Sequence, residues 1–454
     1  MTRTRSAFVS LALLLTAAAC GGKPEKAAPA TTTGAATEAK KAAADDADAE
    51  LSPKARLALQ KLTGTSGADK AVEDAKAAVR RQMTKDDGWI VLGRAWIRKA
   101  RESNDPGFYL NADACAAVVL EQNPDHALAL GLRGLVLLNG HEFAEAADLA
   151  AKIVSKHPDD PMAWGTSSDA LLEMGRYDEA AVAAQRMVDL KPNLPSYSRA
   201  SHLQWLRGDV ANAKQTVRAA LDAGRDAKRD PEPGAWVLVQ AAMIFWNEGD
   251  FDGAEAGFDR ALERISDYAP ANVGKGRVAM ARREHRRAAE LFGRAFAVSP
   301  LVETAWLLGD ARALAGDAKG AEEAYARVER DGRRTDPRTL ALFLSTKGKD
   351  AAGALRLARQ EYASRKDILT EDALAWALYR SGEIDEARAS IVRARRLGTP
   401  DARLVFHEGA IRRAAGEKKK GEALVAQALK MNPAFDATGV KEAEALLGER
   451  LAAR

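Results

Sequence analysis

Residues 127–158 and 161–192 carry nearly the same pattern of side chains, repeated at an interval of 34 residues. In each copy, an apolar helical stretch leads to a turn that contains glycine, and an aromatic residue, an alanine, a further apolar run and a proline follow. The pattern is formed by Gly134, Gly140, Phe143, Ala146, Ile153 and Pro158 in the first copy and by Ser168, Gly175, Tyr177, Ala180, Met187 and Pro192 in the second. A unit of two helices with this length is typical of a solenoid, in which successive units stack on one another. The chain is therefore predicted to be a binding scaffold.

The composition is that of a large folded chain and argues against some other classes of protein. Of the 454 residues, 46% are hydrophobic, which is enough for a continuous core. The mean hydropathy of -0.31 excludes a polytopic membrane protein. Lys and Arg number 68 against 64 Asp and Glu, which leaves a net charge of +4. This balance gives no reason to expect a nucleic-acid partner, because such partners need a concentrated basic face.

The first nineteen residues have the features of an export signal. Arg3 and Arg5 precede a short apolar stretch over residues 7–15, and Ala17–Ala19 form a small-residue cleavage zone before Cys20. This end of the signal resembles a bacterial lipobox, which implies that Cys20 becomes the acylated first residue of the mature protein. Ala17 departs from the usual leucine of that motif. An ordinary signal peptidase site over Ala17–Ala19, which would release a soluble protein, is the alternative.

Residues 20–50 are predicted to be a disordered Ala/Thr/Pro-rich tether behind the lipidated cysteine. They contain no aromatic residue and almost no large aliphatic one, so they cannot bury enough apolar area to fold. As a coil, such a tether would hold a domain about 30 Å from a membrane. By resemblance to proteobacterial sorting signals, Gly21 is not the aspartate associated with inner-membrane retention. This favours attachment to the outer membrane, facing the periplasm.

The repeats resemble the tetratricopeptide repeat (TPR) family. That family places a small residue midway through a first helix, a glycine at the turn, an aromatic residue and then an alanine in a second helix, and a proline at its end. The run Asn-Glu-Gly-Asp-Phe-Asp-Gly-Ala at residues 247–254 follows this pattern closely. The resemblance implies an all-α fold, a right-handed superhelical solenoid of antiparallel helix pairs, with about ten repeats over residues 86–435.

Segments at both ends of this array are predicted to cover it. Residues 51–85 form a helical N-terminal cap, with Ser52 and Pro53 as the N-cap and first helical residue. Residues 436–454 form a C-terminal capping helix, because the last unit of a solenoid needs a polar outer face.

The sequence carries no complete motif for catalysis, a cofactor or a metal. His407-Glu408 begins like a zinc-protease helix, but Ile411 stands where the second histidine is required. Residues 274–279 fit a loose dinucleotide pattern, but they fall inside the first helix of a repeat and follow no strand. Cys115 is expected to be a buried core residue rather than a redox group. We therefore expect a protein that is not an enzyme and that binds no cofactor and no metal.

The resemblance implies that the first helix of each pair lines a concave groove for a protein or peptide partner. Residues three or four apart on such a helix share a face, and aromatic side chains with a few charges are typical of a recognition surface. The alternative for each tryptophan is packing between repeats; Trp205 and Trp246, near the ends of their helices, are the favoured contacts. The predicted groove residues are Arg199, His202, Trp205, Met243, Trp246, Asn247, Arg277, Trp306, Asp310, Trp376 and Tyr379.

The sequence thus favours a membrane-tethered scaffold that mediates protein–protein interactions in the bacterial cell envelope, as other TPR lipoproteins do. Tethering raises the local concentration at one membrane, so a modest affinity in the groove is enough. A soluble periplasmic protein that binds a peptide or glycan is the alternative, and an envelope hydrolase is a third hypothesis. Acylation of Cys20 distinguishes the first hypothesis from the second.

Overall fold

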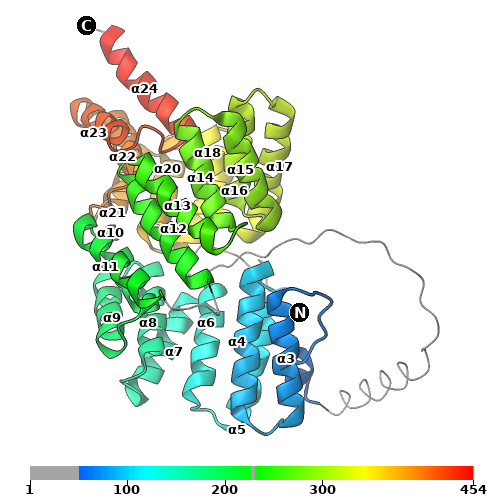
Figure 1. The fold of residues 1–454 in the computed structure, drawn as a ribbon. Coiled ribbons are helices and arrows are strands. Elements are labelled where there is room, and N and C mark those ends of the chain that lie inside the picture. The colour runs from blue at the N-terminus through cyan, green and yellow to red at the C-terminus, as the bar shows by residue number, and fades with distance from the viewer. Residues whose placement is uncertain (1–50, 104, 226–230, 453–454) are drawn as a thin grey trace, which may run out of the picture. The chain divides into compact units, whose positions relative to one another are not determined.

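The computed structural model describes residues 51–103, 105–225 and 231–452. The predicted signal peptide, Cys20 and the tether lie outside the described residues. Within the described ranges, the regular structure consists of helices in consecutive antiparallel pairs, without strands (Figure 1). This confirms the predicted all-α solenoid. None of the described helices is both long enough and apolar enough to cross a membrane.

The described chain divides into two compact units, residues 51–136 and residues 137–452. In the first unit, the indole Nε1–H of Trp96 donates a hydrogen bond to the carbonyl oxygen of Ala58 (2.8 Å). Cys115 lies in the same core, and burial raises the pKa of its thiol. The helices of this unit are α2 (Pro53–Ala58), α3 (Gly67–Arg81), α4 (Asp86–Ser103), α5 (Phe108–Gln122) and most of α6 (Ala127–Asn139).

The second unit contains the longer run of repeats. After α7, each pair consists of an even-numbered first helix and an odd-numbered second helix, and a single helix, α24, ends the chain. The helices are α7 (Phe143–Lys156), α8 (Pro161–Glu173), α9 (Tyr177–Leu190), α10 (Leu194–Leu206), α11 (Val210–Ala223), α12 (Glu232–Asn247), α13 (Phe251–Arg264), α14 (Ala269–Ala281), α15 (His285–Val298), α16 (Val302–Leu314), α17 (Ala318–Thr335), α18 (Pro337–Lys347), α19 (Ala351–Ser364), α20 (Ile368–Arg380), α21 (Ile384–Ala394), α22 (Ala402–Ala414), α23 (Lys418–Met431) and α24 (Ala437–Ala452).

Short turns with a shared chemistry join the two helices of a pair. Gly208 and Gly249 each follow the first helix with a positive φ of 76°, a conformation that costs glycine little. Asp209 and Asp250 come next, and each side chain accepts a hydrogen bond from a backbone N–H in the first turn of the second helix. The glycine thus permits the reversal of the chain, and the aspartate caps the helix that follows.

Small residues in the first helices allow the second helices to approach closely. Ser168 donates its hydroxyl to the carbonyl oxygen of Ala180 (3.0 Å), and Ser201 makes the equivalent bond in the next pair. At Gly309, a Cβ atom would stand only 2.3 Å from the ring of Tyr325. The small positions of the repeat pattern are therefore explained by close packing between the helices of one pair.

Contacts between residues far apart in the sequence join successive turns of the second unit. The N–H of Lys366 donates to the carbonyl oxygen of Glu173 (3.0 Å), and the N–H of Ile368 donates to the hydroxyl of Tyr177 (2.8 Å). The guanidinium of Arg365, which is 1% exposed, forms an ion pair with the buried carboxylate of Glu173. Here the turn between α8 and α9 meets the loop between α19 and α20.

The same kind of contact recurs in the next two pairs. The hydroxyl of Thr399 donates to the carbonyl oxygen of Leu206, and the side-chain amide of Asn432 donates to that of Trp246 (2.8 Å). The contacting residues Arg365 and Glu173 are 192 positions apart, and the next two contacts span 193 and 186 positions. The end of α8 thus meets the start of α20, which is the corresponding first helix six pairs later. The array therefore closes on itself after six pairs, and we call these three contacts the turn-to-turn seam.

Glycine is required at the seam for a reason beyond its backbone conformation. Gly175 has a φ of 73°, and a Cβ there would stand 2.3 Å from the carbonyl oxygen of Lys366. Gly382 occupies the equivalent turn between α20 and α21 with a φ of 82°, but a Cβ there would meet nothing within 4 Å. An alanine would be strained at either position, because the backbone there is left-handed. Only at Gly175 would its Cβ also clash with the seam.

We expect Gly175→Ala to destabilise the protein more than Gly382→Ala. The left-handed conformation costs either alanine about 1–2 kcal/mol, and only Gly175→Ala must also displace Lys366 and weaken the seam, at about 1 kcal/mol for each hydrogen bond lost. Thermal and urea unfolding of the two variants would measure the difference. Equal losses of stability would contradict a closed seam in solution.

Candidate partner-binding surface

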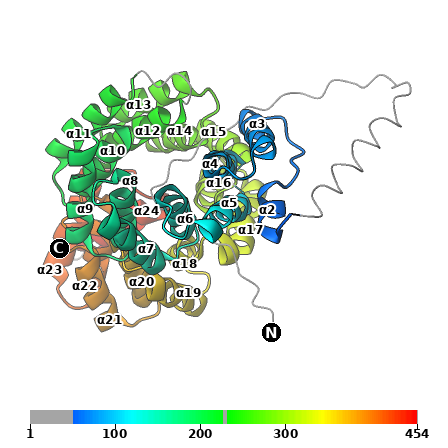
Figure 2. The same cartoon turned by 90° about the horizontal axis from the view of Figure 1, so that it is seen from below.

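The first helices of the pairs line the inner side of the second unit. Figure 2 shows α10 and α12 on the inside of the curved array, with α11 and α13 outside them. The predicted groove residues come from α10, α12, α14, α16 and α20, which are all first helices. They therefore all come from the inner layer of helices, but the surroundings of their side chains differ.

Ion pairs join neighbouring first helices at two places on this side. Both oxygens of Asp169 on α8 accept from the guanidinium of Arg199 on α10, at 2.8 and 2.7 Å. Arg277 on α14 donates to Glu303 on α16 (2.7 Å). The predicted charges Arg199 and Arg277 are therefore paired within the array, where they link adjacent repeats.

The surface of α10 and α12 has a different character. His202 and Trp205 stack with their ring centroids 6.1 Å apart. Burial lowers the pKa of His202 to about 4, so the imidazole is neutral at pH 7. The half-buried Met243 lies on α12, and the side-chain amide of Asn247 donates to its carbonyl oxygen (2.8 Å). This α10–α12 surface is thus aromatic, half-buried and without a charge at these four positions.

The other predicted tryptophans are buried rather than open to a partner. Trp246, Trp306 and Trp376 are 4%, 5% and 1% exposed. The ring of Trp246 packs against Phe251, with centroids 5.2 Å apart, and Trp306 packs edge-on against Phe343 (5.5 Å). Most of the aromatic area expected in the groove therefore stabilises the array itself.

Polar side chains near the end of the array extend the inner surface toward α24. Asp310 accepts hydrogen bonds from the Tyr325 hydroxyl and from Nζ of Lys347, each at 2.6 Å. Burial raises the pKa of Asp310, against the opposing effect of the Lys347 ammonium group. Tyr379 is half-buried beside Trp376, with ring centroids 5.0 Å apart.

The structure also places functional groups that sequence reasoning did not select. Nδ1 of His407 lies 2.7 Å from Asp372, and its ring stacks on Trp376 with centroids 3.9 Å apart. The guanidinium of Arg380 lies over the same indole, 4.7 Å from the centre of the ring. A signal was available for Arg380, because it directly follows Tyr379 in the sequence. His407 and Asp372 meet only through the stacking of α20 and α22.

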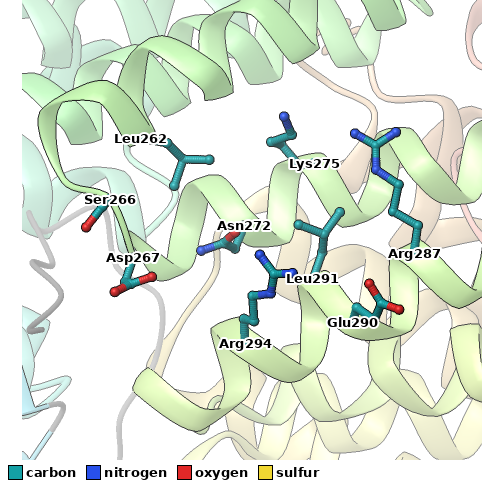
Figure 3. A pocket seen from close by; sticks show the side chains of 9 residues that line it. All are labelled: Leu262, Ser266, Asp267, Asn272, Lys275, Arg287, Glu290, Leu291 and Arg294. Atoms are coloured by element: carbon teal, nitrogen blue, oxygen red, sulfur yellow. The ribbon is translucent and has the colours of Figure 1, made fainter. Parts of the chain in front are cut away.

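A separate polar cavity of about 400 Å³ lies among α13, α14 and α15. Figure 3 shows side chains from these three helices and from the loop before α14 around it. Lys275 at this cavity forms an ion pair with Asp259 and lies 3.6 Å from Glu255, and Arg287 lies 3.4 Å from the same Glu255. These cations are therefore neutralised by the array.

The described residues contain no group of three or more His, Cys, Asp and Glu side chains arranged to hold a metal ion. His407 and Asp372 form a buried pair without a third such ligand. The arrangement on the first helices suits recognition of another molecule by packing and hydrogen bonding.

Comparison with known proteins agrees with this architecture. Tetratricopeptide repeat models match residues 107–161, 137–203 and 273–337. The chain therefore contains tetratricopeptide repeats over residues 107–203 and 273–337. No curated protein matches the chain in sequence.

Solved TPR-like solenoids resemble the chain only in fold. Human IFIT1 in a dimer with m7Gppp-AAAA is 14% identical, with a TM-score of 0.47, covering 80% of this chain and 86% of IFIT1. PilW, a type IV pilus biogenesis factor, is 15% identical with a TM-score of 0.39 over 46% of this chain and 95% of its own. Yeast Tom70 is 13% identical with a TM-score of 0.36, covering 84% and 96%.

The lowered pKa of His202 predicts a specific dependence of stability on pH. Its pKa is about 4 in the folded protein and 6.5 in its unperturbed state, so between these values the unfolded chain binds a proton that the folded chain does not. This contribution to stability is complete above pH 6.5 and decreases as the pH falls toward 4, by at most about 1.4 kcal/mol per pH unit. Urea unfolding of the wild type and of His202→Gln should show a stability difference that changes over this range. A difference independent of pH would contradict the low pKa.

Proposed function

We propose that this TPR protein is a membrane-tethered adaptor of the bacterial cell envelope, which binds a protein partner on the α10–α12 surface. The observation that supports this proposal most directly is the contrast along the inner side of the array. Most of the predicted charges and tryptophans there are paired or buried, while His202, Trp205, Met243 and Asn247 form a half-buried surface with aromatic and neutral polar groups.

The chemistry of this surface suits a protein segment with apolar side chains and an accessible backbone. The indole Nε1–H of Trp205 is buried and has no acceptor among the described residues. A buried donor without a partner costs about 1–3 kcal/mol, and a rotation of the Trp205 side chain on binding would let a carbonyl oxygen of the bound segment remove this cost. The neutral imidazole of His202 and the flexible side chain of Met243 allow apolar groups to pack without desolvating a charge.

The tether rests on the N-terminal sequence. Arg3, the apolar stretch of residues 7–15 and Cys20 support export followed by acylation of the cysteine. A lipid anchor restricts the array to one membrane surface, and the resulting local concentration allows a partner to bind with modest affinity. We place the anchor in the outer membrane, with the repeats in the periplasm, because Gly21 follows the cysteine.

The experiment that tests this proposal compares substitutions on the inner and outer sides of the array. Met243→Glu introduces a carboxylate on the α10–α12 surface, and Val182→Glu introduces one on α9, where the side chain is 67% exposed. We expect crosslinking in intact cells to capture partners with the wild type and with Val182→Glu. Met243→Glu should capture at least about tenfold less partner than the wild type, because an unpaired charge is desolvated in the complex.

The same cells test the anchor when Cys20→Ser is included. This variant should leave the membrane fraction, while purified Cys20→Ser protein should still bind the captured partner. Equal capture by Met243→Glu and the wild type, at equal stability, would rule out the α10–α12 surface. A Cys20→Ser protein distributed like the wild type would rule out lipidation and leave a soluble binding protein.

A further inference from the structure

The C-terminal segment, residues 432–448, lies against the inner side of the last repeats. Thr438 accepts a hydrogen bond from Nζ of Lys347 at the end of α18 (2.9 Å). Glu442, one helical turn later, accepts from both terminal nitrogens of Arg380 on α20, at 3.2 and 2.8 Å. Phe435 packs against Phe406 of α22, with ring centroids 5.4 Å apart. The segment therefore occupies a surface built by three first helices.

Arg380 is oriented by the array without help from this segment. Its Nε donates to the carbonyl oxygen of Ser345 (3.1 Å), and its guanidinium lies over the ring of Trp376 (4.7 Å) and near that of Tyr379 (5.7 Å). The two terminal nitrogens are thereby directed toward Glu442. A planar guanidinium fixed in this way is preorganised for bidentate binding of a carboxylate.

Lys347 is fixed in a similar way. Its ammonium group donates to Asp310 (2.6 Å) and lies 5.2 Å from the centre of the Tyr325 ring. Thr438 uses a further N–H of the same ammonium group. Both cations would therefore remain in place if the segment left.

The segment itself is weakly buried for a helix that ends an array. Ten of the thirteen residues of α20 are buried, but among residues 437–448 of α24 only Gly439 and Ala443 are. Lys441 and Glu444 are exposed, and Figure 1 shows α24 extending away from the last repeats. Charge-assisted hydrogen bonds thus contribute to the attachment, together with the ring of Phe435, the buried Ala443 and the partly buried Val440, Leu446 and Leu447.

The charges indicate what could replace the segment. The surface presents two cations, Lys347 and Arg380, which contact Thr438 and Glu442 of the segment. If the segment left, Lys347 would keep its contact with Asp310, and the carboxylate that now pairs with Arg380 would be gone. Asp436 and Glu442 supply the missing negative charge.

We propose that the inner surface of α18, α20 and α22 is a second docking site, for an acidic amphipathic helix of a partner protein, and that the chain's own C-terminal segment competes for it. The partner helix would present a carboxylate to Arg380 and a hydrogen-bond acceptor to Lys347 one turn earlier, as Glu442 and Thr438 do, and an aromatic side chain to Phe406. The intramolecular segment has the advantage of a high effective concentration. The free site therefore becomes available only when a partner displaces α24. This inference does not depend on the α10–α12 surface.

The probe is a synthetic peptide of residues 432–452 with a fluorescent label, added to the full chain. In the wild type, α24 occupies the site and the peptide should bind weakly. Glu442→Lys in the full chain should repel α24 from Arg380, raise the amide hydrogen exchange of α24 and strengthen peptide binding at least about tenfold. Glu444→Lys, an equal charge change at an exposed position of the same helix, is the matched control and should behave like the wild type.

Two further variants separate docking from a merely structural role. The double variants Arg380→Glu/Glu442→Lys and Arg380→Glu/Glu442→Arg should both restore the slow exchange of α24, because the ion pair is rebuilt in reverse. Both should also bind the peptide no better than the wild type, because the Glu442 of the peptide would meet a carboxylate at position 380. The proposal is overturned if Glu442→Lys releases α24 and the peptide still does not bind. It is also overturned if α24 stays protected in that variant, because the helix would then be a fixed cap. Partner capture through the α10–α12 surface is read separately with Met243→Glu.

Discussion

The turn-to-turn seam joins the first and last repeats of the second unit. A solenoid accumulates a small rotation at each repeat, and nothing in a single repeat requires the chain to meet itself. Here the loop before α20 donates backbone hydrogen bonds to the turn after α8, and Arg365 forms a buried ion pair with Glu173. Buried charges are costly unless they are paired, so this ion pair favours one register between the two turns. Closure after six pairs follows from these contacts.

Closure explains why the inner side of the array is not a uniform groove. The curvature of the array brings the side chains of neighbouring first helices together. Two ion pairs between neighbouring repeats result, Arg199 with Asp169 and Arg277 with Glu303. The aromatic residues near the end of the array merge into one core with Phe435 of the C-terminal segment. The α10–α12 surface stays half-buried, and the surface of α18, α20 and α22 is covered by the chain itself. These two regions are the basis of the two binding sites that we propose.

The sequence predicts the repeat architecture because the signals are local. A serine or glycine in a first helix and an alanine or aromatic residue in the second meet within one pair, as Ser168 and Ala180 or Gly309 and Tyr325 do. The inner surface is harder to predict because it depends on contacts between pairs. The helical register selects Trp246 and Trp376 together with Trp205, but it does not reveal that packing against Phe251 and His407 buries the first two. The ion pair of Glu442 with Arg380 is equally hard to predict, because it depends on the rotation that the array has accumulated before α24 begins.

Amide hydrogen exchange at the turn-to-turn seam shows whether the array closes after six pairs in solution. Ile368 is the first residue of α20, and an N–H group in that position has no acceptor within its own helix, so its protection must come from Tyr177. If the array closes after six pairs, the amides of Lys366 and Ile368 should exchange slowly in the wild type, and Tyr177→Phe should raise the rate at Ile368 while that of Lys366 changes little. Rapid exchange of both amides in the wild type, with the helices of the same pair still protected, would show an open solenoid and contradict this account.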